Sequence, residues 1–153
     1  MTMHVPAKVD YGVRAMLTLA ELDEPATSET LASAQRLPAR FLGAILVDLR
    51  RAGLVSNQRG LAGGYCLARP ASEISVADVI RALNGPLAEI RGRRPETASY
   101  DGAAVHLQDV WVAARASLRK VLECVSLADV VAGNLPGTVV SLTTDPDAWA
   151  PRP

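Results

Sequence analysis

The sequence predicts a mainly α-helical protein that carries one small β-hairpin. Apolar residues recur at helical spacing over residues 7–52, and two short apolar runs flank a polar, glycine-rich tip within residues 53–68. A second helical pattern starts at residue 107 and repeats for nearly three heptads. The chain has 153 residues, 49% of them hydrophobic, which suits either one folded domain or one small domain with an added oligomerisation element.

Three helices are expected before the hairpin. The first covers roughly residues 7–22 and ends at an Asp-Glu-Pro break. The second is capped by Thr27 or Ser28 and ends near Arg36. The third occupies residues 38–52, with a proline at its start and a glycine after its end.

The hairpin follows the third helix directly. Its apolar arms are residues 54–55 and 65–67, and Arg59 stands at the turn. A helix that continues into a basic, glycine-tipped hairpin is the sequence form of a winged helix-turn-helix. Such a unit places the helix in the major groove of DNA and the hairpin on the flanking backbone or minor groove.

Two capping boxes mark helix starts in the rest of the chain. Ser75 with Asp78 opens a fourth helix, and Ser126 with Asp129 opens a short last helix. The expected organisation is a winged helix-turn-helix domain at 1–84, an exposed loop at 85–103, a dimerisation helix with the short terminal helix at 104–133, and a flexible tail at 134–153.

A heptad-like apolar seam lies in the second half of the chain. It fits two interpretations, an amphipathic helix packed on its own domain or a dimerisation helix. The second is favoured because a winged domain closed by residue 83 has little core left to offer. The seam consists of Leu107, Trp111, Ala114, Leu118, Val121 and Val125.

Charge is unevenly distributed although the formal net charge is zero. Residues 34–69 contain six arginines and a single acid, Asp48, which gives this segment a net charge of +5. Local positive charge is what phosphate binding and counterion release require. The alternative interpretation of these arginines is a solvated face.

The third helix carries the first candidate DNA contacts. Arg40 and Phe41 lie in its first turn, where recognition helices meet base edges. Arg40 suits a guanine edge or a phosphate, and Phe41 suits a thymine methyl group or packing against its apolar neighbours. Arg50 and Arg51 suit phosphate contacts or stabilisation of the helix end.

The hairpin tip carries the strongest single candidate. Arg59, flanked by glycines, can enter a narrow minor groove, although those glycines also serve the turn itself. Gly60 beside it and Ser28 at the start of the second helix complete the candidates taken from these elements.

The remaining chemistry argues against catalysis and metal binding. No nucleophile–base pair, phosphate-binding loop or paired carboxylates stand in a catalytic pattern, so the chain is not expected to be an enzyme. Cys66 and Cys124 are far apart and suggest neither a disulfide framework nor a zinc site. Without an apolar signal region or an apolar run near 18 residues, the protein is expected to be cytoplasmic, with no membrane partner.

The combination resembles the Rrf2 family of bacterial winged-helix regulators, the IscR, NsrR and CymR group. The resemblance covers roughly residues 5–132. A fairly specific part of it is the hairpin together with the Arg-Arg-Ala-Gly-Leu-Val stretch that leads into it. The matching stretches are 10–20, 41–42, 49–55, 59–60, 63–65, 74–80, 111 and 127–131.

This resemblance implies a homodimeric transcription factor, usually a repressor, on a pseudo-palindromic operator in double-stranded DNA. It also implies that the long helix crosses to the partner subunit. By position, Arg40, Phe41 and the later arginines match the DNA-facing elements, and Lys8 and Tyr11 match backbone contacts at the start of the first helix.

One departure from the family concerns its iron–sulfur cluster. Many members hold a cluster with three cysteines in the loop before the dimer helix, whereas residues 86–106 here contain no cysteine. Asp10 stands where some members place a carboxylate ligand, but without the cysteines it makes no site. No cofactor is therefore expected. The effector could then be a small molecule or a partner protein, or the protein could act without one. The alternative function is a protein-interaction module built on the winged helix.

Overall fold

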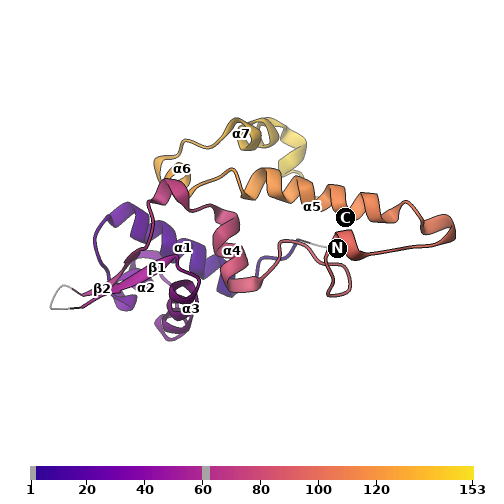
Figure 1. Cartoon of the computed structure of the whole chain (residues 1–153). Helices are drawn as coiled ribbons and strands as arrows, with labels where there is room; N and C mark the ends of the chain where they lie inside the picture. Colours follow the sequence, from indigo (N-terminus) through magenta and orange to yellow (C-terminus); the bar gives the residue numbers. More distant parts are fainter. Residues whose placement is uncertain (1–2, 60–62) are drawn as a thin grey trace.

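The computed structural model describes residues 3–59 and 63–153 and has the predicted fold, mainly helical with one antiparallel hairpin (Figure 1). The α-helices are α1 (Ala7–Leu22), α2 (Ser28–Gln35), α3 (Ala39–Arg51), α4 (Val76–Asn84), α5 (Leu107–Leu122), α6 (Leu127–Ala132) and α7 (Gly137–Thr144). The strands are β1 (Val55–Gln58) and β2 (Gly64–Leu67), and short 3-10 turns are η1 (Ala71–Glu73), η2 (Pro95–Thr97), η3 (Gly102–Ala104) and η4 (Pro146–Trp149).

Local capping sets where the helices begin. The hydroxyl of Thr27 accepts a hydrogen bond from the Thr30 N–H, so Thr27 rather than Ser28 caps α2. Both predicted capping boxes are present, at the starts of α4 and α6. In each, the serine hydroxyl accepts from the backbone N–H of the aspartate, and the aspartate carboxylate accepts from the backbone N–H of the serine. These motifs confirm the sequence reading of the helix starts.

The core of the winged domain gathers side chains from α1 to α4 and the base of the hairpin. Met16, Leu31, Leu46 and Leu49 are fully buried in it. Gly12 allows α1 to approach α4, because a Cβ at this position would overlap with the side chain of Leu83. The apolar side chains that recur at helical spacing along α1 to α4 thus face this common core.

The hairpin is fastened to the turn between α1 and α2. Its strands pair Val55 with Leu67 through Gln58 with Gly64. On the other side of β2, Tyr65 exchanges two backbone hydrogen bonds with Ala26, of 2.8 and 2.9 Å. This bridge gives the short hairpin a third pairing segment and holds its base in a fixed orientation.

The chain returns to the winged domain after α5. Leu127, the first residue of α6, is fully buried, and its N–H donates to the Ile74 carbonyl at 2.9 Å. The Val76 N–H donates to the Val125 carbonyl at the same distance. Val125 lies beyond the end of α5 and is only 7% exposed, so its expected place in the apolar seam is corrected: it belongs to the core of its own chain.

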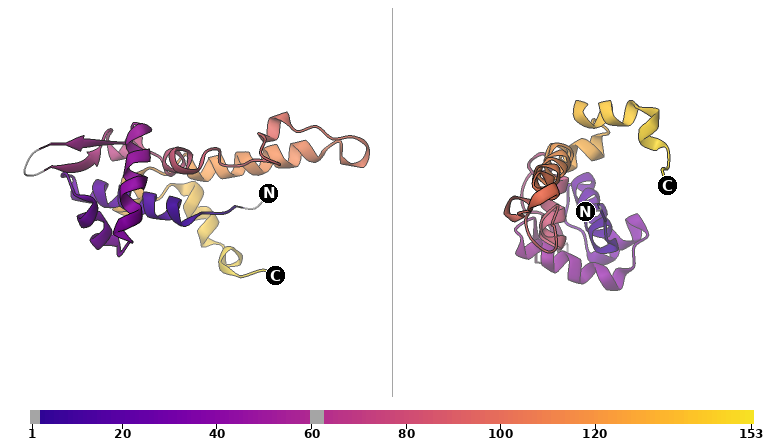
Figure 2. Two further views of the ribbon diagram at one scale, coloured as in Figure 1. Left: turned by 90° about the horizontal axis from the view of Figure 1, so that it is seen from below. Right: turned by 90° about the vertical axis from the view of Figure 1, so that its right-hand side faces the viewer.

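Helix α5 extends away from the winged domain, opposite the hairpin (Figure 2). None of its residues is buried in the single chain. Residues 85–103 lead outward from α4 alongside α5, which runs back toward the winged domain. Pro95 and Ala98 are buried, so this segment is more structured than the exposed loop expected from its composition.

The terminal segment also differs from expectation. Residues 134–153, expected as a flexible tail, contain α7 and η4, and α7 contacts α5. The prolines that suggested fraying stand just before these elements: Pro136 precedes α7, and Pro146 begins η4. Among the described residues, no helix combines the length and the apolar character needed to cross a membrane.

The hairpin anchor predicts opposite effects of alanine at two glycines. A Cβ at Gly64 would lie 2.6 Å from the carbonyl carbon and oxygen of Ala26, whereas a Cβ at Gly43, inside α3, meets nothing within 4 Å. Gly64→Ala should therefore lower the free energy of unfolding by about 1–3 kcal/mol. Gly43→Ala should raise it by about 1 kcal/mol, because alanine favours the helix.

Urea unfolding followed by circular dichroism, at one protein concentration, measures both. Equal stability of the Gly64→Ala and unmodified proteins would mean that the hairpin does not depend on its pairing with Ala26.

Candidate nucleic-acid interface

Helix α3 has one face in the core and the other in solvent. Leu42, Ile45, Leu46 and Leu49 are buried, and this four-residue set follows the helical repeat. The opposite face presents the candidate contacts. Arg40, Phe41, Ala44, Arg50 and Arg51 are exposed there.

The first turn of α3 is open to a ligand. No side chain caps its N-terminus, where Pro38 is the N-cap residue. Free N–H groups at a helix start favour phosphate oxygens. Phe41 is 48% exposed, and the guanidinium of Arg40 lies 4.6 Å from the centre of its ring. Phe41 is therefore not a core residue, and the Arg40–Phe41 pair forms a cationic, apolar surface at the helix start.

Lys8 of α1 also reaches this surface. Its Nζ lies 2.7 Å from Oδ2 of Asp48, the single acid among residues 34–69, and Arg51 approaches the other oxygen at 4.0 Å. The hydrogen bond and charge of Lys8 lower the pKa of Asp48 below its ordinary value. Asp48 thus holds Lys8 against α3 and reduces the positive charge of this face.

Tyr11 belongs to α1, is half-buried and lies beside residues of α3. Together with Phe41 and Lys8 it borders a shallow groove of about 370 Å³. The groove joins the start of α1 to the exposed face of α3, so four of the predicted contact residues, Lys8, Tyr11, Arg40 and Phe41, come from neighbouring positions.

The arginine of the hairpin does not line this groove. Arg59 follows directly after β1 and is exposed. Gly60, the other hairpin candidate, lies outside the described residues. Ser28 is half-buried at the start of α2, where its hydroxyl lies 3.3 Å from the Glu29 carboxylate.

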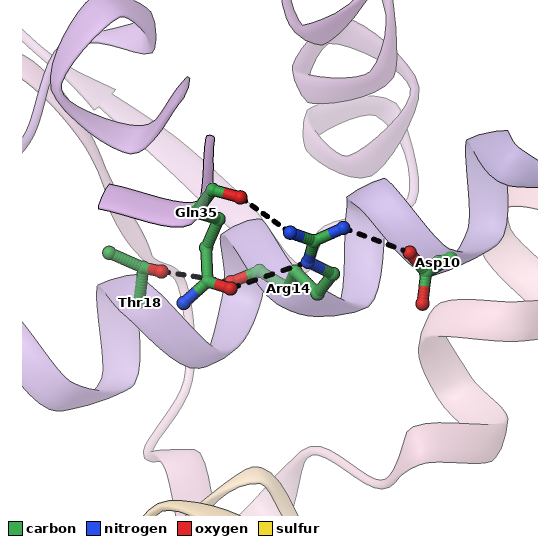
Figure 3. A network of polar contacts seen from close by, with 4 residues as sticks. All are labelled: Asp10, Arg14, Thr18 and Gln35. Carbon is green, nitrogen blue, oxygen red and sulfur yellow. Dashed lines mark hydrogen bonds and ion pairs between the residues drawn. The ribbon is translucent and has the colours of Figure 1, made fainter. Parts of the chain in front are cut away.

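A polar brace sets the angle between α1 and the helix-turn-helix (Figure 3). The Arg14 guanidinium donates to the backbone carbonyl of Gln35, at the end of α2, and to its side-chain amide oxygen at 3.3 Å. The same guanidinium donates to Asp10, one turn earlier on α1, at 3.2 Å. The bond to the carbonyl satisfies an acceptor that the end of α2 leaves free.

Sequence reasoning did not assign a role to this brace or to the pairing at Ala26. The four-residue spacing of Asp10 and Arg14 signals an ion pair within α1. Nothing local signals the contact with Gln35, which is 21 positions away. Asp10, which the resemblance related to a cluster ligand, serves instead as a partner of Arg14.

The expected interface helix is α5. Leu107, Trp111, Ala114, Leu118 and Val121 share one face of it and are all partly exposed. The Trp111 indole donates to the Tyr100 hydroxyl at 3.1 Å, which ties the ring to the segment before α5.

The two cysteines lie in separate surroundings. Cys66, in β2, is half-buried with its Sγ 3.2 Å from the Ser56 hydroxyl. Cys124 is exposed after α5 and donates to the Val121 carbonyl. In the part of the chain that the structure describes, no group of three or more His, Cys, Asp or Glu side chains could hold a metal ion.

Known proteins share this architecture. The chain is 48% identical over 145 residues to an HTH-type transcriptional regulator of Mycobacterium tuberculosis, covering 94% of this chain and 90% of that protein. The solved structure of CymR, the global cysteine regulator of B. subtilis, matches with a TM-score of 0.74 at 27% identity, covering 86% of this chain and 98% of that one. IscR of T. potens matches with a TM-score of 0.70 at 33% identity, covering 87% and 89%.

Residues 5–133 match the model of the Rrf2 family, described as iron-dependent transcriptional regulators. The iron of that description does not fit the described residues, because an iron–sulfur cluster needs about four ligands, mostly thiolates. Here Cys66 and Cys124 stand apart, and the segment before α5 has no cysteine. In fold and sequence, however, the chain belongs to the Rrf2 family of DNA-binding, winged-helix transcriptional regulators, which are not enzymes.

Proposed function

We propose that this regulator is a homodimeric repressor that binds a pseudo-palindromic operator without an iron–sulfur cluster. The observation that carries the DNA-binding part is the exposed first turn of α3. Uncapped N–H groups, Arg40 and Phe41 are presented there together, beside a groove that reaches Lys8. This arrangement supports insertion of α3 into the major groove, with Arg59 of the hairpin on the flanking DNA.

The homodimer is supported by the apolar face of α5. A helix with an apolar seam of about two heptads normally buries that seam. In the single chain no residue of α5 is buried, and the helix projects away from the winged domain. A second copy of the chain, related by a twofold axis, covers such a face with the same face. The two α3 helices would then meet two half-sites, and occupancy of an operator that overlaps a promoter would block transcription.

Arg59 gives the first test. Arg59→Ala should weaken binding to a duplex selected from a random pool by the unmodified protein, by about 1–3 kcal/mol, and should reduce the slope of log K against log salt by about 0.9. Fluorescence anisotropy at several salt concentrations measures both. Arg152→Ala is the control, since Arg152 is also exposed but lies beyond the family match.

Unchanged affinity in Arg59→Ala would remove the hairpin from the proposed contact. If binding of the unmodified protein to DNA did not depend on salt, a protein-interaction module would become the better description.

Asp48 gives a second test, with the opposite sign. Asp48→Asn removes the single acid of residues 34–69 and releases Lys8, so binding to unselected DNA should tighten, by up to about fivefold for an exposed ion pair. Lys8→Ala, which removes the other partner, should weaken it. Weaker binding by Asp48→Asn would show that the Lys8–Asp48 pair is needed to shape the surface.

The pH dependence of this pair follows from the lowered pKa of Asp48. A carboxyl whose pKa is lower in the folded state stabilises the fold above the pKa of the unfolded chain, about 3.9, and this contribution is lost as the pH falls through the folded value. The pair should therefore leave stability and DNA binding unchanged between about pH 5 and 8, where Asp48 stays charged.

Two alanines of α5 test the dimer. Ala114 lies in the apolar seam, and Ala116, two residues later, is exposed on the other side of the helix. Ala114→Asp should raise the dimer dissociation constant at least about 100-fold, because each subunit would bury an unpaired carboxylate. Ala116→Asp should leave it unchanged. Sedimentation equilibrium measures the constant, and equal dimerisation of both variants would refute the proposed interface.

A further inference from the structure

A pocket at the base of α5 is lined by four arginines. Arg81 comes from α4, Arg94 precedes η2, and Arg115 and Arg119 lie one turn apart on α5. The pocket has a volume of about 340 Å³, and residues 85–88, which follow α4, complete its wall. Arginines from three segments that are distant in the sequence therefore meet in one pocket.

Acidic partners neutralise only part of this charge. Arg115 forms an ion pair with Glu96, the single acid in the pocket wall, and Arg81 forms one with Glu123. Among the described residues, Arg94 and Arg119 form no ion pair. The arginines thus exceed the acids that contact them, and an unneutralised cluster of like charges disfavours the folded chain.

Arg115 is not a solvated surface arginine. Its side chain is only 12% exposed, and its Nε is buried with no hydrogen-bond partner in the described part of the protein. Burying a donor without an acceptor costs free energy, and such a group in a native protein calls for an explanation. A backbone N–H and the Arg115 guanidinium lower the pKa of Glu96, which accepts from another nitrogen of the guanidinium and leaves Nε without an acceptor.

We propose that this pocket binds a small multivalent anion through carboxylate or phosphate groups. The planar guanidinium offers paired donors that match both groups, and two unpaired arginines on facing segments can hold two acidic groups at once. The volume accommodates an anion of the size of citrate or pyrophosphate. Lysines would supply the charge but not this paired geometry.

The position of the pocket gives the anion a route to regulation, which rests on the proposed dimer. Arg81 belongs to the winged domain, whereas Arg115 and Arg119 belong to the helix proposed to pair with the second subunit. An anion that bridges them fixes the angle between α4 and α5. That angle sets the separation of the two α3 helices on the operator, so the anion and the DNA would influence each other's affinity.

Isothermal titration calorimetry on the intact protein, without DNA, tests the site itself. Citrate and inorganic pyrophosphate are the probes, at constant ionic strength in a chloride buffer. We expect one of them to bind once per chain, and the one that binds identifies the acidic group as carboxylate or phosphate. Arg94→Ala and Arg119→Ala should each weaken binding at least about tenfold, the loss expected for a charge-assisted hydrogen bond.

Arg93→Ala is the matched control, since Arg93 is an exposed arginine beside Arg94 that does not line the pocket. It should leave the affinity within about twofold of the unmodified protein, and thermal melts of all variants check that they are folded. Equal weakening by Arg93→Ala would indicate general attraction to a positive surface and overturn the site. If neither probe showed saturable binding below about 10 mM, the anion site would also be overturned. Acidic side chains of a second subunit that occupy the pocket would give this result.

A separate measurement distinguishes this site from the DNA interface. If Arg94→Ala and Arg119→Ala weakened DNA binding while no probe bound the unmodified protein, the arginines would be a second DNA contact and the anion site would be wrong. Because the calorimetry contains no DNA, its failure leaves the proposed repressor unaffected. Conversely, a protein that binds the anion but not DNA would overturn only the repressor.

Discussion

The burial of Leu127 in the core of the winged domain is the contact on which the rest of the structure depends. It brings the chain back after α5, and the backbone bonds of Leu127 with Ile74 and of Val76 with Val125 secure this return. Without it α5 would be joined to the winged domain at one end alone. With it, the helix is anchored before and after, so its direction is set by the core that positions α3. A change at α5 can therefore reach α3, the helix proposed to bind DNA, through packed contacts.

The distribution of charge explains how a chain with zero net charge binds a polyanion. Phosphate attraction depends on the local field, and residues 34–69 carry the excess of arginine. The charges within that segment are also arranged by the fold. Asp48 lies against Lys8 and within 4.0 Å of Arg51, so its negative charge is offset by these two cations within the folded surface. The fold therefore adds to the excess of positive charge that the composition of residues 34–69 already provides.

Most of the fold could be predicted from the sequence because its signals are local. Apolar periodicity, capping serines and a glycine-tipped hairpin each depend on a few neighbouring residues, and all point to one arrangement. The site was less predictable. Residues of α3 and the hairpin follow from the helix pattern, but the Arg14–Gln35 brace and the Ala26–Tyr65 pairing join distant positions that no short-range rule relates.

The errors have the same origin. Val125 continues the heptad spacing, yet the helix ends at Leu122, and the next residues turn back into the core. Residues 85–103 are polar enough to be a solvated loop, but Pro95 and Ala98 pack along α5. In both cases tertiary contacts outweighed local composition, and those contacts join positions that are distant in the sequence.

Helix α5 combines an apolar seam and a cationic edge on adjacent faces. Arg115 and Arg119 each directly follow a seam residue, so their side chains emerge about 100° around the helix from Ala114 and Leu118. A rotation of α5 about its axis would move both surfaces together, changing the fit to the second subunit and the distance from Arg119 to Arg94 at once. The pocket and the proposed interface are therefore coupled by the rigidity of a single helix, and no long chain of intermediate residues is needed to connect them.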